Sequence, residues 1–312
     1  MAAMMSGFDI RRAHPPGAVF STWRAPDGWP LRRMDWRQPN GRPARGNLFF
    51  AAGRGDFIEK YLESHAHWHA AGWNVTTFDW RGQGGSRGDI VGGNHASFDP
   101  LVNDLGALIV DWRGDSTGPH VAIGHSMGGH LLLRTLVDRA PALDAAALIA
   151  PMLEVNAKPM PPGLAPWIAA VMCRLGRSDA RVWKAPPPGD RRQRALTGGS
   201  PERYADEGWW WEREPGFNIG PPSWGWLAAA YRSAARGFTP EKLAGVKLPV
   251  LLLASATDRL VGLEAIERAA GLLPDATLHV YPRAGHEILR EADPIRDDAL
   301  ARIAAFFDEH AR

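Results

Sequence analysis

The sequence predicts an α/β fold in which a mostly parallel central sheet has helices on both faces and carries one long insertion. Three observations support this prediction. Apolar runs alternate with stretches of helical spacing, glycine-rich loops follow several of these runs, and the alternation stops after Pro151 and resumes near Leu248. A chain of 312 residues with 45% hydrophobic and 22% charged residues is long enough for one large core with such an insertion.

The first part of the expected core, residues 1–151, opens with two apolar runs around the turn Pro26-Asp27-Gly28, which predict an antiparallel pair. The later runs are uninterrupted, as is typical of parallel strands buried on both faces, and Gly72 closes the first helical stretch. The expected strands are 18–25, 31–37, 47–52, 73–80, 120–124 and 145–150, and the expected helices are 57–71, 98–112 and 127–139.

The second part of the expected core, residues 243–312, repeats the pattern of a strand followed by a helix. Strands are expected at 248–254 and 276–281, and helices at 263–272 and 294–310. Between the two parts lies the insertion, residues 152–242. It holds twelve of the 26 prolines and seven of the 14 tryptophans, so we expect a folded cap of short pieces without long regular helices.

Composition excludes several classes of protein. A formal net charge of +2 gives no overall field that favours nucleic acid, and a single cysteine, Cys173, forms neither an intrachain disulfide nor a cysteine metal site. His65 and His69 share one helix face, but two ligands make a poor metal site. We expect no metal and no organic cofactor. No signal peptide and no apolar run of 18 residues is recognisable, which predicts a cytoplasmic protein.

The run Gly124-His125-Ser126-Met127-Gly128 lies between an expected strand and an expected helix, the context of a nucleophilic serine at a sharp turn. Only glycine avoids a steric clash two positions before and after the serine in such a turn. The helix that follows presents free backbone N–H groups to developing negative charge. The sequence therefore predicts Ser126 as a catalytic nucleophile.

A nucleophilic serine needs a histidine as its base and a carboxylate that orients the imidazole. Asp258 and His286 follow two successive expected strands, so both belong to loops at the carboxyl edge of the sheet, in the chain order Ser, Asp, His that is typical of this context. Other histidines fit less well because they fall inside a strand (His279), near the end of the last helix (His310) or beside the turn (His125 and His130).

Attack on an ester carbonyl creates an oxyanion that two backbone N–H groups must stabilise. Met127 supplies one at the start of its helix, and Arg54, after the strand 47–52, is the candidate for the second. Gly53, directly before it, is expected to contact the substrate. The Arg54 guanidinium either holds a phosphate head group or is a solvated surface group.

Together these residues resemble the α/β-hydrolases of the bacterial lysophospholipase and monoacylglycerol lipase group, which is also described as serine aminopeptidase-like. The resemblance covers about residues 45–151 and 245–310 and does not extend to the cap. Monoacylglycerol lipases have His-Gly in the oxyanion loop, whereas Ala52-Gly53-Arg54 is more similar to the lysophospholipases. The resemblance implies a serine hydrolase, an esterase or lipase with a Ser-His-Asp catalytic triad, that cleaves a lipid-like carboxylic ester and needs no cofactor.

Alternatives remain open at this point. A proline iminopeptidase-like peptidase would need acidic side chains in the cap to bind the substrate amine, and candidates are present at Glu202, Asp206, Glu207, Glu212 and Glu214. An acyltransferase would differ only in the group that receives the acyl chain. A hydrolase-like small-molecule receptor would lack an activated serine.

The cap contains three consecutive tryptophans, Trp209, Trp210 and Trp211, whose side chains point in different directions on a helix or a strand. We therefore expect at least one of them to bind substrate as part of an acyl-binding wall, or to face a partner or a lipid surface. Packing of the cap onto the sheet is the alternative. The expected partner is a small-molecule ester, with transient contact between the cap and a membrane surface and no obligate protein partner.

Overall fold

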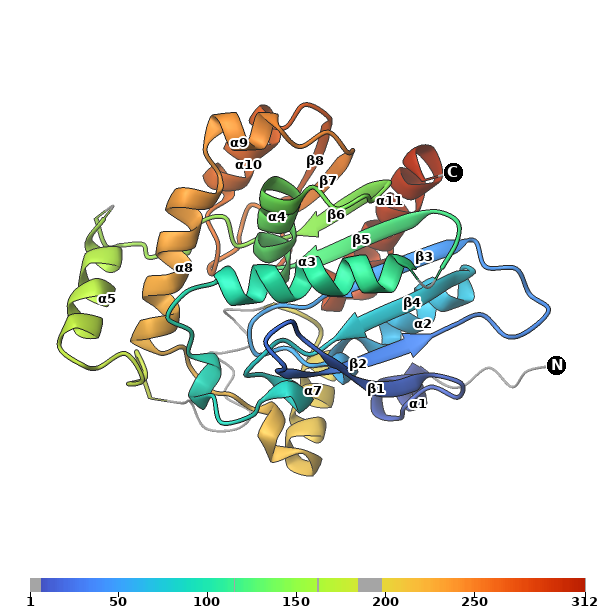
Figure 1. Ribbon diagram of the computed structural model, residues 1–312, viewed down its shortest axis with the longest axis horizontal. Coiled ribbons are helices and arrows are strands. Elements are labelled where there is room, and N and C mark those ends of the chain that lie inside the picture. Colours follow the sequence, from blue (N-terminus) through green and yellow to red (C-terminus); the bar gives the residue numbers. More distant parts are fainter. Residues whose placement is uncertain (1–6, 115, 162, 185–197, 312) are drawn as a thin grey trace.

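The computed structural model describes residues 7–114, 116–161, 163–184 and 198–311, and it has an eight-stranded sheet at its centre (Figure 1). The strand order is β1-β2-β4-β3-β5-β6-β7-β8, and only β2 runs antiparallel to its neighbours. The strands are β1 (Val19–Arg24), β2 (Pro30–Trp36), β3 (Gly46–Ala51), β4 (Trp73–Phe78), β5 (His120–His125), β6 (Ala145–Ile149), β7 (Val250–Ser255) and β8 (Ala276–Tyr281). The mostly parallel sheet predicted from the apolar runs is confirmed.

Helices cover both faces of this sheet. In Figure 1, α3 and α4 lie in front of the sheet, and α2 and α11 lie behind it. The bounds are α1 (Gly7–Arg12), α2 (Leu62–Ala70), α3 (Asp99–Gly114), α4 (Met127–Arg139), α10 (Leu263–Leu272) and α11 (Asp293–His310), and a 3-10 turn at Ile58–Tyr61 precedes α2. Every residue of β3, β5, β6 and β7 is buried, because both faces of these central strands are covered.

The segment between β6 and β7 contains regular helices, which corrects the expectation of short pieces. They are α5 (Leu164–Arg174), α7 (Pro201–Arg213), α8 (Trp224–Gly237) and α9 (Pro240–Ala244). The described prolines do not prevent these helices because they fall in connecting segments or, as with Pro201 and Pro240, in the first turn, where no intrahelical N–H is needed. Residues 185–197 of the expected cap lie outside the described residues.

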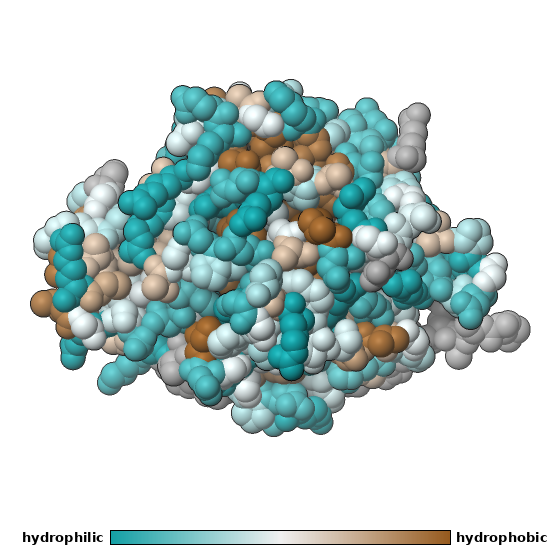
Figure 2. All heavy atoms as spheres, in the orientation of Figure 1, coloured by the Kyte–Doolittle hydropathy of each residue, from teal (hydrophilic) through white to brown (hydrophobic). Residues whose placement is uncertain are grey.

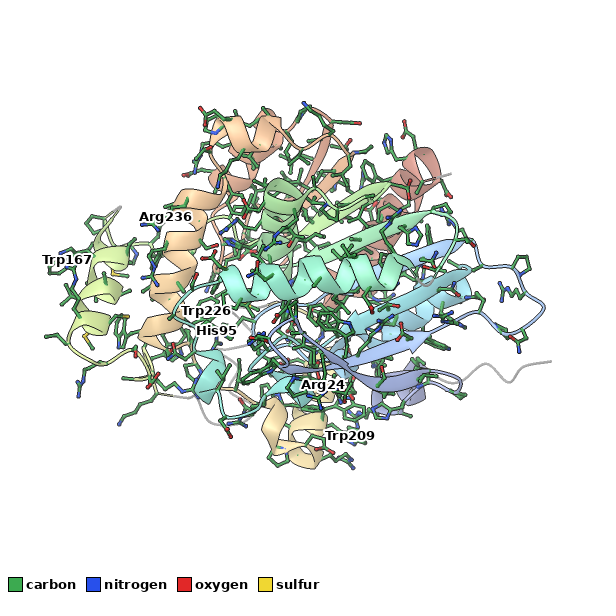
Figure 3. The ribbon with its side chains drawn as sticks, viewed as in Figure 1. Arg24, His95, Trp167, Trp209, Trp226 and Arg236 are labelled. Atoms are coloured by element: carbon green, nitrogen blue, oxygen red, sulfur yellow. The ribbon has the colours of Figure 1, made fainter. Side chains whose placement is uncertain are left out.

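The face shown in Figure 2 is mainly hydrophilic, with small separate hydrophobic areas. Large apolar side chains are exposed on and near α5, among them Trp167 with 62% and Leu175 with 68% of its surface accessible. Figure 3 shows Trp167 at the outer edge of the molecule. In the described part of the chain, no helix combines the length and the apolar character needed to cross a membrane.

Candidate active site

Ser126 lies at a sharp turn between β5 and α4, with the backbone angles φ 53° and ψ −117°. Residues other than glycine rarely adopt such angles, so the surrounding structure must hold the turn in place. A Cβ atom on Gly124 would lie 2.7 Å from the carbonyl oxygen of Gly128, and one on Gly128 would lie 2.1 Å from that of Ala51. Glycine is therefore required at both positions, as expected from the motif.

Three side chains from the carboxyl ends of parallel strands meet at this turn: Ser126 after β5, Asp258 after β7 and His286 after β8. Nε2 of His286 lies 2.8 Å from Oγ of Ser126, and Nδ1 of His286 lies 2.7 Å from Oδ2 of Asp258. These distances suit transfer of the serine proton to the imidazole while the carboxylate fixes the orientation of the ring. The structure thus brings together the three residues that the sequence pattern assigned to a triad.

The surroundings of the pair favour a charged Asp258 and a basic His286. Burial lowers the pKa of His286, but the charge and hydrogen bond of Asp258 outweigh burial and leave that pKa above its ordinary value. Burial raises the pKa of Asp258, whereas His286 and the backbone N–H groups of Leu260 and Val261, which donate to Oδ1, hold it below its ordinary value. Asp258 can therefore stabilise the imidazolium that forms when Ser126 loses its proton.

The loops that carry Asp258 and His286 are also tied to each other. The hydroxyl groups of Ser255 and Thr257 both donate to the carbonyl oxygen of Ala284, and the bond from Thr257 measures 2.7 Å. These bonds hold the two loops in register, so the short contact between carboxylate and imidazole does not depend on the side chains alone.

The loop after β3 approaches the serine closely. A Cβ on Gly53 would lie 3.1 Å from Cβ of Ser126, while the backbone N–H of Gly53 donates to Oδ2 of Asp56 at 2.7 Å. Across residues 7–114, 116–161, 163–184 and 198–311, the backbone N–H groups of Arg54 and Met127 donate to no acceptor. Both N–H groups are therefore free for an oxyanion, the role for which the sequence makes them candidates.

The guanidinium of Arg54 lies against the β6–β7 segment. Nη1 and Nη2 each donate to the carbonyl oxygen of Gly220 at 3.1 Å, and Nη2 also donates to that of Gly92 at 3.0 Å. The guanidinium carbon lies 5.1 Å from the ring centroid of Trp226, a residue of α8 that Figure 3 labels. The alternative of a solvated surface arginine is thus wrong. The Arg54 side chain instead connects the oxyanion loop to Gly92, Gly220 and Trp226.

A network of buried ion pairs also contacts the oxyanion loop, through Asp56. Nζ of Lys60 lies 2.7 Å from Oδ1 of Asp56, 2.8 Å from Oε1 of Glu287 and 3.2 Å from Oε1 of Glu207. Arg290 pairs with both Glu207 and Glu287. The five side chains are only 3–8% exposed, so their charges interact with little screening by solvent.

This network connects the catalytic loops, and sequence analysis missed it. Asp56 binds the N–H of Gly53, and Glu287 directly follows His286, whose carbonyl oxygen lies 3.3 Å from Nε2 of His125. The sequence signals were two short spacings, of Asp56 and Lys60, four residues apart, and of Glu287 and Arg290, three residues apart. The partner residue Glu207 lies in α7, about 150 positions away, and could not be paired from the sequence.

The three consecutive tryptophans of α7 contact a second hydrophobic cluster. Nε1 of Trp210 donates to the carbonyl oxygen of Arg11 at 2.9 Å, and its ring stacks on His14 at 5.5 Å between centroids. Trp209 and Trp211 pack against the same cluster, which also contains Met34, Phe57, Ile58, Leu62 and Phe217. Because α7 packs along α1 and the turn before α2, these contacts support the alternative of packing over an acyl-binding wall.

Comparison with known proteins agrees with this geometry. Residues 42–293 match the family model described as serine aminopeptidase, S33. The chain is 28% identical over 282 residues to lysophospholipase L2 of Escherichia coli, covering 83% of this chain and 79% of that protein. It is 26% identical over 271 residues to a monoacylglycerol lipase of Mycolicibacterium smegmatis, covering 84% and 89%.

Solved structures with the same architecture include a soluble variant of monoglyceride lipase from Saccharomyces cerevisiae. It superposes with a TM-score of 0.72 and 18% identity, covering 96% of this chain and 98% of that one. A carboxyl esterase from Bacillus coagulans superposes with a TM-score of 0.70 and 18% identity, covering 95% and 99%. The fold is that of the α/β-hydrolases, as the sequence resemblance implied. The chain belongs to the serine aminopeptidase, S33 family.

Proposed function

We propose that the protein is a serine hydrolase that cleaves carboxylic esters of lipids through an acyl-enzyme. The observation that carries this proposal is the chain of short contacts from Ser126 through His286 to Asp258, beside two free backbone N–H groups. The relatives named lysophospholipase and monoacylglycerol lipase support a lipid ester as the substrate.

In the first half of the reaction, Oγ of Ser126 attacks the ester carbonyl carbon while its proton passes to Nε2 of His286. The N–H groups of Arg54 and Met127 stabilise the resulting oxyanion. When the bond to the alcohol breaks, the proton moves from Nε2 to the departing oxygen. In the second half, water donates a proton to Nε2 of His286 and attacks the acyl carbon. The bond to Ser126 then breaks, Nε2 returns the proton to Oγ, and the carboxylic acid is released.

We propose that residues 152–242 act as a cap between this site and the lipid phase. Exposed apolar side chains lie on and near α5, which belongs to this segment, and Arg174 and Arg177 are exposed beside them. Apolar and basic side chains on one surface favour contact with an anionic lipid surface. Such contact would be transient and would bring the esters of the membrane close to the cap.

The peptidase alternative is less well supported because acidic side chains of α7 already have cationic partners. Asp206 lies 2.5 Å from Nε of Arg11 and 2.6 Å from Nε of Arg12. Glu207 pairs with Lys60 and with Arg290. Binding of a substrate amine by these two carboxylates would require existing buried ion pairs to break, at a high cost in free energy.

Substrate profiling tests the proposal. Purified protein is assayed on 1-hexanoylglycerol, p-nitrophenyl butyrate and an amino-acyl anilide, with the Ser126→Ala variant as the control. We expect hydrolysis of both esters, a much slower reaction with the anilide and loss of the ester activity in the variant. Faster cleavage of the anilide than of the esters would instead establish a peptidase. Transfer to an added alcohol in preference to water would establish an acyltransferase.

A further inference from the structure

The buried arginine side chains of this fold are neutralised by carboxylates. Six of the described arginines have less than a tenth of their surface exposed, and each of them pairs with an aspartate or a glutamate: Arg33, Arg81, Arg134, Arg203, Arg290 and Arg296. A buried guanidinium without a counter-ion is costly, so this pairing is what physical chemistry leads us to expect.

Three other arginines are partly exposed and lie near one another without such a partner. Arg54, Arg87 and Arg181 form no ion pair with an aspartate or glutamate in the part of the chain that the structure describes. Their acceptors are backbone carbonyl oxygens, of Gly92 and Gly220 for Arg54, of Gly216 for Arg87 and of Pro221 for Arg181.

The guanidinium group of Arg181 repels those of Arg54 and Arg87. Burial, and after it the charge of Arg181, lowers the pKa of Arg54 to about 9. The pKa of Arg181 is lowered by burial and then by Arg87. Nε of Arg54 is shielded from solvent and has no hydrogen-bond partner among the described residues. No described carboxylate therefore compensates the positive charge of these three side chains, which come from three separate segments of the chain.

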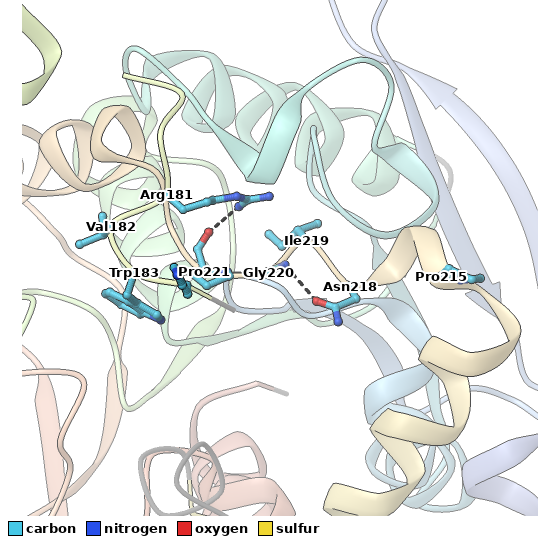
Figure 4. Close-up of a pocket in the computed structure, with 9 residues that line it drawn as sticks. Arg181, Val182, Trp183, Pro215, Asn218, Ile219, Gly220 and Pro221 are labelled. Atoms are coloured by element: carbon cyan, nitrogen blue, oxygen red, sulfur yellow. Dashed lines mark hydrogen bonds between the residues drawn. The ribbon is translucent and has the colours of Figure 1, made fainter. Parts of the chain in front are cut away.

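Arg181 lines a cavity of about 670 Å³ (Figure 4). The lining also includes Lys184, Asn218, Ile219 and Gly220. The described residues that line it include no aspartate and no glutamate. The volume is within the range of small-molecule sites, and Arg181, which donates one bond to Pro221, retains further N–H groups for a ligand.

Two residues of the cavity wall contact the oxyanion loop. The carbonyl oxygen of Gly220, which lines the cavity, accepts both bonds from Arg54. The side chain of Ile219 reaches within 3.7 Å of the point that a Cβ on Gly55 would occupy. The wall of the cavity is therefore continuous with the loop that carries Arg54.

We propose that this cavity binds the phosphodiester of a lysophospholipid, with Arg181 and Lys184 as its direct cationic ligands. The proposal rests on the proposed ester hydrolysis, because the phosphodiester is taken to be part of the alcohol that departs from the acyl carbon when Ser126 is acylated. A guanidinium matches two phosphate oxygens at once, and the ammonium adds a point charge. Arg54 then acts as a positioning residue that fixes the Gly220 wall. The protein is accordingly selective for phosphate-bearing monoacyl lipids over neutral monoacylglycerols.

The test compares two short-chain substrates that dissolve as monomers and share the same ester: 1-hexanoylglycerol and its 3-phosphoglycerol diester. Arg181→Gln and Lys184→Gln are the test variants. Arg232→Gln is the matched control, because Arg232 is an exposed arginine of α8 that donates to the carbonyl oxygen of Ala96 and does not line the cavity. Unfolding temperatures confirm that all variants are folded.

We expect the wild type to have the higher kcat/KM on the phosphodiester. Arg181→Gln raises KM for the phosphodiester about tenfold or more, through loss of a charge-assisted contact, and changes kcat/KM for the neutral ester by less than about threefold. Lys184→Gln has a smaller effect of the same kind, and Arg232→Gln changes neither substrate. Equal effects of Arg181→Gln on the two substrates, or no effect on either, would overturn the proposal.

Two further outcomes are informative. One distinguishes a site for phosphate from a site for the product carboxylate, and the other distinguishes failure of this inference from failure of the proposed function. sn-Glycerol 3-phosphate is expected to inhibit hydrolysis of 1-hexanoylglycerol in the wild type and much less in Arg181→Gln. Stronger inhibition by hexanoate than by glycerol phosphate, lost in the same variant, would assign the cavity to the product carboxylate and overturn the assignment to phosphate. If the wild type hydrolyses neither ester, the proposed function fails together with this inference, whereas hydrolysis without phosphate selectivity rejects only the inference.

Discussion

Replacing Lys60 by Met is expected to destabilise the protein strongly, because it removes the ammonium that three buried carboxylates share. The carboxylates of Asp56, Glu207 and Glu287 lie 2.7–3.2 Å from Nζ, and the side chains are 3–8% exposed. Removing one partner of a buried pair costs about 3–5 kcal/mol. Arg290 still pairs with two of the three carboxylates, so we expect a loss near the lower end, about 3 kcal/mol.

The loss should also depend on pH. Lys60 is among the causes that hold the pKa values of Asp56 and Glu287 below their ordinary values, against the effect of burial, which raises them. A depressed carboxylate pKa contributes stability that is present above the unfolded-state pKa, near 4, and is lost as pH falls. The difference between wild type and Lys60→Met should therefore narrow as pH falls below about 4.

Urea unfolding at pH 7 and at about pH 3 measures both effects. Lys158→Met is the matched control, because Lys158 forms an ion pair with Glu264 at 3.5 Å in which both side chains are more than 70% exposed. An exposed pair contributes about 0–1 kcal/mol, so the control should change little. If Lys60→Met also costs less than about 1 kcal/mol at pH 7, or if its cost grows as pH falls, the reasoning about the buried network is refuted.

Three further predictions concern the turn, the base and the second hydrophobic cluster. Gly128→Ala should abolish activity and lower expression of folded protein, because the new Cβ would lie 2.1 Å from the carbonyl oxygen of Ala51; near-normal activity in purified variant would contradict this. Asp258→Asn should lower kcat about 10⁴-fold and move the acidic limb of kcat/KM to lower pH, because the charge that raises the pKa of His286 is lost; a pH-rate profile with an unshifted limb would count against it. Trp210→Ala should lower the unfolding free energy by about 3–5 kcal/mol and leave the ratio of kcat/KM for octanoyl and acetyl esters unchanged; a selective loss on the octanoyl ester would favour the acyl-wall hypothesis.

The core strands and the catalytic residues could be predicted because their signals are local. A buried parallel strand is a short apolar run, and the turn around Ser126 needs glycine at two fixed positions. Once the strands are placed, parallel pairing brings their carboxyl ends to one edge of the sheet, and Asp258 and His286 follow two of them. Their meeting point with Ser126 therefore follows from topology.

The cap was harder to predict because its contacts are distant in sequence. A high proline content favours short helices in general, yet Pro201 occupies the first turn of a helix of 13 residues. The direction of Trp210 depends on α1 and His14, almost 200 positions earlier, and no periodicity in the cap encodes that partner. The buried ion network likewise joins Lys60 to Glu207 and Glu287, which lie in separate segments.

Covalent labelling of Ser126 is the most direct test of the central claim that this serine is an activated nucleophile. The protein is treated with a fluorophosphonate, and the modified peptide is identified by mass spectrometry. The remaining hydrolysis of 1-hexanoylglycerol is measured on the same samples. We predict one adduct on Ser126, loss of activity in proportion to labelling, no adduct in Ser126→Ala and much slower labelling in His286→Ala. Labelling of a different residue, or undiminished ester hydrolysis once Ser126 is fully modified, would contradict the account.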